Sequence, residues 1–367
     1  MKSFRFVCYF LIFGLNTNLC FCLGQDSLTA RKIINCSLSY HHGYLFPHHR
    51  LVTYFTGEYI NGFDLALSRY MPELKPDNPP EMGIGYYCSN LGNMDIYGYT
   101  HGLYLYASRD FFRNKSPFSF YQVIGMGTSY NTKHYSISEN YSNRLIGSHL
   151  NIFFLYSLGI KINIHDKLLL SAGPAAVHTS NGNIRQPNFG LNLLNTRFSM
   201  TYLIDSKKKI KYPSPDMETG YNKNRFLMII AGGVRQVSHR LPDYFTIGSL
   251  NADYTRRLKP NLALGLGMDL VYDPTEGMEL YVTGAHIENI VPWHMGLHFS
   301  YERIWNHLSL VINPGYKIYT PSEHFNYQYN RVGVRYRLDN HLVLNYTLKS
   351  HRFVADFIEF GIGYIFE

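Results

Sequence analysis

The sequence predicts an all-β chain that folds into an antiparallel transmembrane β-barrel of the bacterial outer membrane. Three observations favour this fold. Apolar side chains recur at every second position in many segments, aromatic and charged residues each make up 16% of the chain, and no stretch is apolar over the roughly 18 residues that a membrane-spanning helix needs. Ordinary soluble domains are about 25% charged, so the composition excludes a coiled coil and a disordered chain and favours a large, aromatic-rich β protein.

The beginning of the chain has the layout of a secretory signal peptide. Lys2 and Arg5 precede an apolar run over residues 6–15, and the segment ends at Cys22 and Gly24, small residues that stand two apart. A basic start, a short apolar middle and a small-residue cleavage site are the three parts of such a signal. We therefore expect the chain to be exported across the inner membrane and this segment to be removed.

Two cysteines, Cys36 and Cys88, remain after that cleavage. An oxidising compartment permits a disulfide between them. Two small apolar thiols that pack separately fit the sequence equally well, so the pairing stays open at this point.

Segments of period two follow one another through the body of the chain. Over residues 262–270 large apolar side chains alternate with Ala, Gly and Asp, and the segments 331–338 and 342–349 repeat the alternation. The second face carries mostly Gly, Asn, Thr, Arg and Lys, whereas the apolar face is edged by Tyr and Phe. A membrane barrel has this combination, with lipid outside, a polar interior and aromatic girdles, and its strands must close because lipid satisfies no backbone group. A secreted β-sandwich, which also alternates, is the less favoured alternative.

The turn residues between these segments set the expected domain boundaries. We expect roughly 12 to 16 strands, with about 14 as the best estimate, because strands are about ten residues long and bacterial single-chain barrels have even strand numbers. We assign residues 1–24 to the signal peptide, 25–52 to a segment before the barrel and 53–367 to one barrel. The last strand alternates up to Phe366 and resembles the sorting signal of outer-membrane barrels, although Glu367 follows the aromatic residue.

One segment has a pattern that indicates chemistry. His178 and Ser180 are two residues apart, so they lie on the same face of one strand with Cα atoms roughly 6.5–7 Å apart. At that separation an imidazole nitrogen can reach the hydroxyl, and a serine needs such a base beside it to act as a nucleophile. The turn that follows contains Asn181, Gly182 and Asn183, whose amide groups could point at a developing oxyanion.

A third group must orient the imidazole through its other ring nitrogen. Asp166 is the only carboxylate within residues 141–204, and it lies at the far end of the strand that carries His178. Because no acid is local, Asn188 and Asn192 are the candidates, since an asparagine has this role in some Cys-His systems.

Residues 178–192 resemble the active-site region of PagL-type lipid A 3-O-deacylases. That family has His-x-Ser-Asn, a short spacer, Pro-Asn-x-Gly and then the triad acid, and this chain has His178, Ser180 and Asn181, then Pro187-Asn188-Phe189-Gly190 and Asn192. The chain is longer than the small PagL barrels and is similar to acyloxyacyl hydrolase relatives of Bacteroidetes-type bacteria. Flanking matches extend the resemblance over residues 43–205, at 43–48, 90–93, 125–127 and 146–151.

The pattern departs from the family at one position. PagL-type enzymes have Glu where this chain has Asn192. The outer-membrane phospholipase A resembles the same core, with an Asn twelve residues after the Ser, and Ser180 and Asn192 are also twelve residues apart. The resemblance therefore implies His178, Ser180 and Asn192 as catalytic residues. Because a neutral third member stabilises an imidazolium less than a carboxylate does, we expect a slower enzyme or a second orienting group.

These observations predict an outer-membrane serine esterase that removes an ester-linked fatty acyl chain from lipid A. The amides of Asn181, Gly182 and Asn183 and the side chain of Asn188 would hold the oxyanion, and no metal or organic cofactor is expected. A phospholipase A that acts on glycerophospholipids and a non-enzymatic porin or structural barrel are the alternatives. The expected partners are lipopolysaccharide or another membrane lipid, with a homodimer left open and no nucleic acid, and the net charge of +8 suits an anionic lipid surface.

Overall fold

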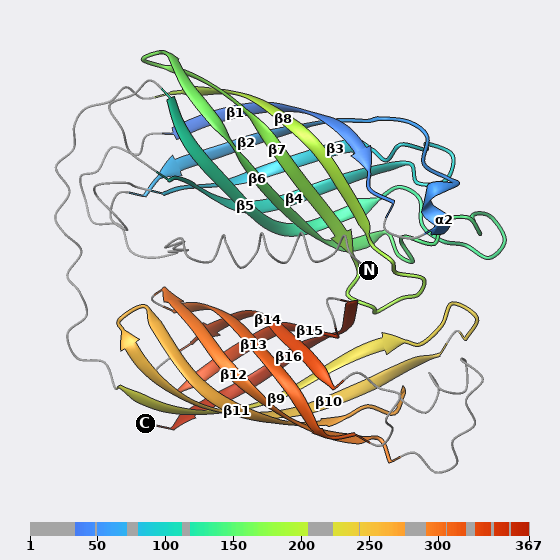
Figure 1. The fold of residues 1–367 in the computed structure, drawn as a ribbon, viewed down its shortest axis with the longest axis vertical. Helices are drawn as coiled ribbons and strands as arrows, with labels where there is room; N and C mark the ends of the chain where they lie inside the picture. The colour runs from blue at the N-terminus through green and yellow to red at the C-terminus, as the bar shows by residue number, and fades with distance from the viewer. Residues whose placement is uncertain are drawn as a thin grey trace. The chain divides into compact units, whose positions relative to one another are not determined.

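The chain forms two closed antiparallel β-barrels of eight strands each (Figure 1). The computed structural model describes residues 34–47, 50–71, 80–111, 118–204, 223–241, 243–275, 291–305, 307–320, 327–338, 341–351 and 354–366. No helix in these ranges is long and apolar enough to cross a membrane.

The N-terminal barrel is closed by the pairing of its first and last strands. In that pairing Cys36 lies opposite Tyr202 and His41 lies opposite Arg197. A short helix, α2 (Arg50–Thr53), stands between the first two strands. The eight strands are β1 (Ile34–Leu45), β2 (Ile60–Tyr70), β3 (Glu81–Asn90), β4 (Tyr99–Asp110), β5 (Phe118–Asn131), β6 (Leu150–His165), β7 (Leu168–Ser180) and β8 (Leu191–Leu203).

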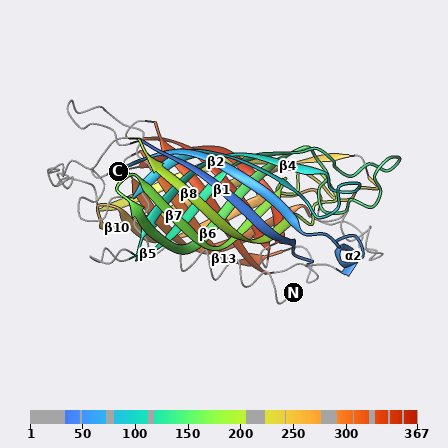
Figure 2. The ribbon, with the colours of Figure 1, turned by 90° about the horizontal axis from the view of Figure 1, so that it is seen from above.

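The C-terminal barrel closes in the same way. Its first strand pairs with its last, and Ile230 lies opposite Ile362. The eight strands are β9 (Asn224–Gln236), β10 (Tyr244–Lys259), β11 (Leu262–Tyr272), β12 (Trp293–Trp305), β13 (Leu308–Tyr319), β14 (Gln328–Arg337), β15 (Leu342–His351) and β16 (Val354–Phe366). In both barrels the strands run at a slant (Figure 2), as closure of a sheet requires.

The described residues form two barrels rather than the single barrel predicted over residues 53–367. Their sixteen strands lie within the predicted range of 12 to 16, whereas the best estimate of 14 is not confirmed. Strand β1 lies within residues 25–52, the segment predicted to precede the barrel. Period-two alternation defines the faces of each strand but not its partners, so it could not reveal that β8 pairs with β1. The predicted signal peptide, residues 1–24, lies outside the described residues, and Cys36 and Cys88 are free thiols.

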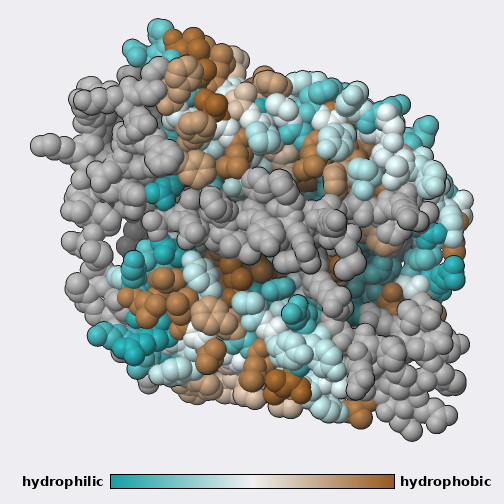
Figure 3. All heavy atoms as spheres, in the orientation of Figure 1, coloured by the Kyte–Doolittle hydropathy of each residue, from teal (hydrophilic) through white to brown (hydrophobic). Residues whose placement is uncertain are grey.

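The faces of the strands are those that the sequence predicts for a membrane barrel. On β2 the side chains of Phe63 and Leu65 are 47% and 50% exposed, whereas Asp64 between them is completely buried. Brown, hydrophobic residues are accordingly visible on the outer surfaces of both barrels (Figure 3). An apolar exterior is the arrangement that lipid requires, and it is the inverse of the solvent-facing surface of a soluble sandwich.

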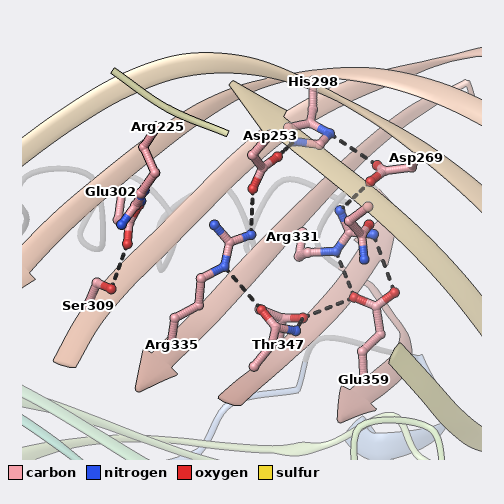
Figure 4. Close-up of polar contacts among 12 residues, drawn as sticks. Arg225, Asp253, Asp269, His298, Glu302, Ser309, Arg331, Arg335, Thr347 and Glu359 are labelled. Atoms are coloured by element: carbon pink, nitrogen blue, oxygen red, sulfur yellow. Dashed lines mark hydrogen bonds and ion pairs between the residues drawn. The ribbon is translucent and has the colours of Figure 1, made fainter. Parts of the chain in front are cut away.

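Each barrel has a filled interior. The N-terminal interior packs buried aromatic residues such as Tyr87, Tyr104 and Phe153, together with an ion pair in which Arg197 Nε lies 3.0 Å from Asp64 Oδ2. The C-terminal interior is an extended ionic network (Figure 4). Pairing of opposite charges in this network offsets the cost of burying them, because an unpaired charge in the interior would be strongly destabilising.

Candidate active site

Three polar side chains form a hydrogen-bonded row where β7 ends and β8 begins. His178 and Asn192 are cross-strand partners, and Ser180 is the last residue of β7. His178 Nδ1 lies 2.7 Å from Asn192 Oδ1, and His178 Nε2 lies 3.0 Å from Ser180 Oγ. The carboxamide oxygen can only accept, so Nδ1 carries the proton and donates it to Asn192. Nε2 of the neutral ring is then the acceptor for the Ser180 hydroxyl, which is the arrangement of a base beside a nucleophile.

Asn188 and Asn192 are the two asparagines that the sequence predicts as candidates for the third residue of the triad. The His178 imidazole contacts Asn192. Asn188 is used differently, because its Oδ1 accepts a hydrogen bond of 3.1 Å from the backbone N–H of Asn181. That bond engages the Asn181 amide within the loop, so the amide does not point at a substrate. It also fixes the orientation of the Asn188 carboxamide, which presents its nitrogen as the donor.

The loop after β7 is shaped by residues with positive φ. Gly182 and Asn183 have φ values of 63° and 73°, a conformation that glycine and asparagine adopt most easily. The sequence had predicted a turn here. The asparagine side chain before the turn connects this loop to the one between β5 and β6, because Asn181 Nδ2 donates to Ser148 Oγ at 3.0 Å.

Gly190 is a part of the site whose role the sequence analysis did not identify. Its φ is 77°, and a Cβ atom at this position would lie 2.8 Å from His178 Cε1 and 3.5 Å from Ser180 Cβ. Its backbone N–H donates to Leu145 O at 2.9 Å. The left-handed conformation and the contact with the imidazole both require a residue without a side chain, which gives a physical reason for the glycine in the Pro-Asn-x-Gly motif.

The row lies on the outer face of the barrel. Val177 and Thr179, the neighbours of His178 along β7, are buried in the interior, so alternation directs His178 and Ser180 outward. On β8 the same outward row continues from Asn192 to Phe198 and other half-exposed apolar side chains. A lipid beside the barrel can therefore reach the hydroxyl without entering the lumen.

The row is also at the end of the barrel that has the long connections. Residues 46–59, 91–98, 132–149 and 181–190 connect strands at this end, whereas residues 71–80, 111–117 and 166–167 connect strands at the other. Outer-membrane barrels have short periplasmic turns and longer extracellular loops. Because the longest connections are at the end that carries the row, we expect this end to be the extracellular one. Within the part of the chain that the structure describes, no group of three or more His, Cys, Asp or Glu residues could hold a metal ion.

Each barrel matches a family model. Residues 61–201 match the model described as lipid A 3-O-deacylase (PagL), and residues 224–367 match the model described as acyloxyacyl hydrolase, C-terminal domain. The first match runs from β2 to the end of β8 and includes all three residues of the row, and the second begins at β9. No curated protein matches the chain.

Several solved structures are similar to the chain at low identity. The outer membrane enzyme PagL is 17% identical with a TM-score of 0.30, over 44% of this chain and 97% of that one. The toluene transporter TodX of Pseudomonas putida is 8% identical with a TM-score of 0.18, over 91% and 87% of the two chains. The beta domain of the Bordetella autotransporter BrkA is 9% identical with a TM-score of 0.26, over 92% and 99%.

Proposed function

We propose that this chain removes an ester-linked fatty acyl chain from lipid A with Ser180 as nucleophile. The chain belongs to the family of PagL-type lipid A 3-O-deacylases and acyloxyacyl hydrolases and is an ester hydrolase of the outer membrane. One observation carries the proposal. Ser180, His178 and Asn192 are joined by hydrogen bonds of 3.0 and 2.7 Å on the outward face of the barrel, where acyl esters of the outer leaflet lie.

The first half of the reaction forms an acyl-enzyme. His178 Nε2 takes the hydroxyl proton of Ser180 while Oγ attacks the ester carbonyl carbon. The negative charge on the carbonyl oxygen is held by the Asn188 carboxamide nitrogen. As the tetrahedral intermediate collapses, the bond to the sugar oxygen breaks, and His178 returns its proton to that oxygen.

The second half releases the fatty acid. A water molecule gives a proton to His178 and attacks the acyl-serine carbonyl, and the proton then returns to Ser180 Oγ as the ester bond breaks. Asn192 keeps Nδ1 protonated throughout, so Nε2 remains the nitrogen that exchanges protons. Being neutral, Asn192 stabilises the imidazolium less than a carboxylate would, which supports a slow turnover.

The identity of Asn192 also favours a second candidate substrate. An asparagine in this place is the feature that resembles the outer-membrane phospholipase A, which makes glycerophospholipids the alternative. The Pro187-Asn188-Phe189-Gly190 spacer and the match of residues 61–201 to the lipid A deacylase model favour lipid A.

Mass spectrometry of outer membranes from cells with and without the protein separates the two substrates. We expect lipid A species that have lost one ester-linked chain, unchanged phospholipids, and no change with Ser180→Ala. Lysophospholipids in place of deacylated lipid A would support the phospholipase, and lipid A that is still processed by the Ser180→Ala protein would refute the proposed nucleophile.

A further inference from the structure

The loop between β5 and β6, residues 132–149, carries more basic than acidic side chains and lies beside the candidate active site. It contains Lys133, His134, Arg144 and His149, against one acidic residue, Glu139. The proposed mechanism gives these side chains no role. Basic residues at the extracellular end of a membrane protein can bind the anionic groups of lipids.

The loop has a fixed conformation. Asn143 is buried, and its Nδ2 donates to Ile96 O at 3.1 Å and to Lys133 O at 3.3 Å. Leu145 and Ile146 are completely buried in the core of the N-terminal barrel. The basic side chains are therefore presented from a rigid frame, so little conformational entropy would be lost when they bind a ligand.

Two histidines of this loop are in contact and have the same hydrogen-bond arrangement. His134 Nδ1 lies 2.6 Å from Tyr135 O, and His149 Nδ1 lies 2.6 Å from Asn131 O. A carbonyl oxygen can only accept, so both Nδ1 atoms are donors and Nε2 is the atom at the far side of each ring. The ring centroids are 4.2 Å apart at an interplanar angle of 85°, and the His149 ring stacks on Tyr130 at 5.1 Å.

The histidine pair lies beyond Ser180 in the direction of the extracellular side. Ile152 on β6 is the cross-strand partner of Ser180, and His149 precedes it by three residues, which corresponds to about 10 Å along an extended chain. Ser148 also accepts the hydrogen bond from Asn181, so the two loops are in direct contact. A lipid with its ester carbonyl at Ser180 has its acyl chain beside the strands and its head group at the level of the pair.

We propose that His134 and His149 bind a phosphate of the lipid substrate's head group. This inference rests on the proposed function, because it assigns the head-group subsite of the same reaction. When the Nε2 atoms of both rings carry a proton, a phosphate group can accept a hydrogen bond from each of them, and these bonds are charge-assisted because the phosphate is anionic. Lys133 and Arg144 add positive charge, and the Arg144 guanidinium is held 4.0 Å above the Tyr141 ring.

The test compares two lipids in neutral detergent micelles: bis-phosphorylated lipid A and the same lipid A from which both phosphates have been removed. For the double variant His134→Gln/His149→Gln, we expect the KM for the phosphorylated lipid to rise at least about tenfold, because the loss of even one charge-assisted hydrogen bond has this effect and the variant removes two. The KM for the dephosphorylated lipid and both kcat values should stay within about twofold of wild type.

His101→Gln is the matched control, because His101 is also a surface histidine of this barrel whose Nδ1 is hydrogen-bonded, to Tyr86 at 2.8 Å. It should change neither KM. An equal loss with both lipids would show that the pair only supports the loop, and no loss with either would show that it binds no phosphate. The single variant His134→Gln, which leaves the contact between His149 and Asn131 intact, replaces the double variant if the latter does not fold.

A binding measurement distinguishes failure of the subsite from failure of the proposed nucleophile. The Ser180→Ala protein should bind phosphorylated lipid A micelles more tightly than dephosphorylated ones, and the histidine substitutions should abolish that difference. If Ser180→Ala still hydrolyses lipid A, the proposed nucleophile is wrong, whereas equal binding of the two lipids overturns the subsite.

Discussion

The same three-residue pattern occurs in both barrels and has different surroundings in each. In the N-terminal barrel His178 and Ser180 face outward, and the imidazole contacts both Ser180 and Asn192. In the C-terminal barrel His298 and Ser300 on β12 face the interior and are buried. His298 lies 2.6 Å from Asp253 and 3.2 Å from Asp269 (Figure 4), so both of its nitrogens are bonded to carboxylates.

The difference shows that the spacing of a His-x-Ser pair does not define its surroundings, because the face of the strand decides whether the pair lies outside the barrel or in its interior. A shift of one residue along a strand exchanges the two faces. The outward histidine has the neutral partner Asn192, whereas the inward histidine belongs to an ionic network. Within that network Arg331 contacts Asp269 at 2.8 Å and Glu359 at 2.6 Å.

The most direct test of the difference between the two His-x-Ser pairs is to remove each serine hydroxyl in turn. Ser180→Ala should lower kcat for lipid A deacylation by at least about 10³-fold, as loss of a nucleophile does in serine hydrolases. Ser300→Ala is the matched control and should leave the rate unchanged, because Ser300 Oγ is buried and has no hydrogen-bond partner among the described residues. Release of fatty acid from purified lipid A measures both, and a comparable loss with Ser300→Ala would refute the assignment.

Gly190 permits a second comparison, between a glycine in contact with the imidazole and one without close neighbours. Gly190→Ala should lower kcat by about 10²-fold, because the new Cβ displaces the His178 ring and small displacements of catalytic groups have effects of this size. On β10 a Cβ at Gly248 would meet no atom within 4 Å. Gly248→Ala should therefore leave kcat unchanged, and equal rates for the two variants would contradict the role of Gly190.

The sequence was sufficient to predict the barrel fold and the proximity of His178 and Ser180, but not the division of the strands into two barrels. His178 and Ser180 are related by strand geometry alone, which is a local property. Asn192 was one of two candidates until the register placed it opposite His178. The closure of β8 onto β1 depends on pairing between Cys36 and Tyr202, residues far apart in the chain, and alternation contains no information about such partners.

Contacts between loops could not be predicted from the sequence either. The hydrogen bond from Asn181 to Ser148 joins two turns whose proximity follows only from the order of strands around the barrel. Gly190 was visible as part of a motif, but its contact with the His178 ring depends on how the loop returns to β8. Local periodicity therefore predicts which residues share a face, and tertiary closure determines which loops support them.

Substitutions of Asn192 measure how much a neutral third residue contributes to kcat. Asn192→Ala should lower kcat about tenfold, the effect of losing one hydrogen bond of about 1.4 kcal/mol. Asn192→Asp should raise kcat above that of the alanine variant and of wild type, because a carboxylate stabilises the imidazolium better. Asp269→Asn makes the reverse change beside His298 and should not alter kcat. Steady-state rates on micellar lipid A measure all three, and an Asn192→Ala enzyme with the wild-type rate would refute the orienting role.

The smallest expected effect on the rate comes from removing a buried arginine of the C-terminal barrel. Arg331→Met removes the guanidinium that pairs with Asp269 and Glu359 and should cost about 3–5 kcal/mol of stability, as the removal of one member of a buried ion pair does. The two tryptophans of the chain, Trp293 and Trp305, both lie on β12. Their fluorescence therefore reports the unfolding of this barrel alone, and its midpoint should fall.

Arg197→Met removes the corresponding ion pair with Asp64 from the N-terminal barrel. It should change the denaturant dependence of hydrolysis and leave the tryptophan transition unchanged. Hydrolysis should decline at a lower denaturant concentration, because β8 carries both Arg197 and Asn192, while the tryptophan transition keeps its midpoint. Arg331→Met should leave the rate in the absence of denaturant within about twofold of wild type, because no residue of the network takes part in the proton transfers. If either substitution shifts both transitions together, the two barrels unfold as one unit, and the separation of catalysis from the ionic interior does not hold.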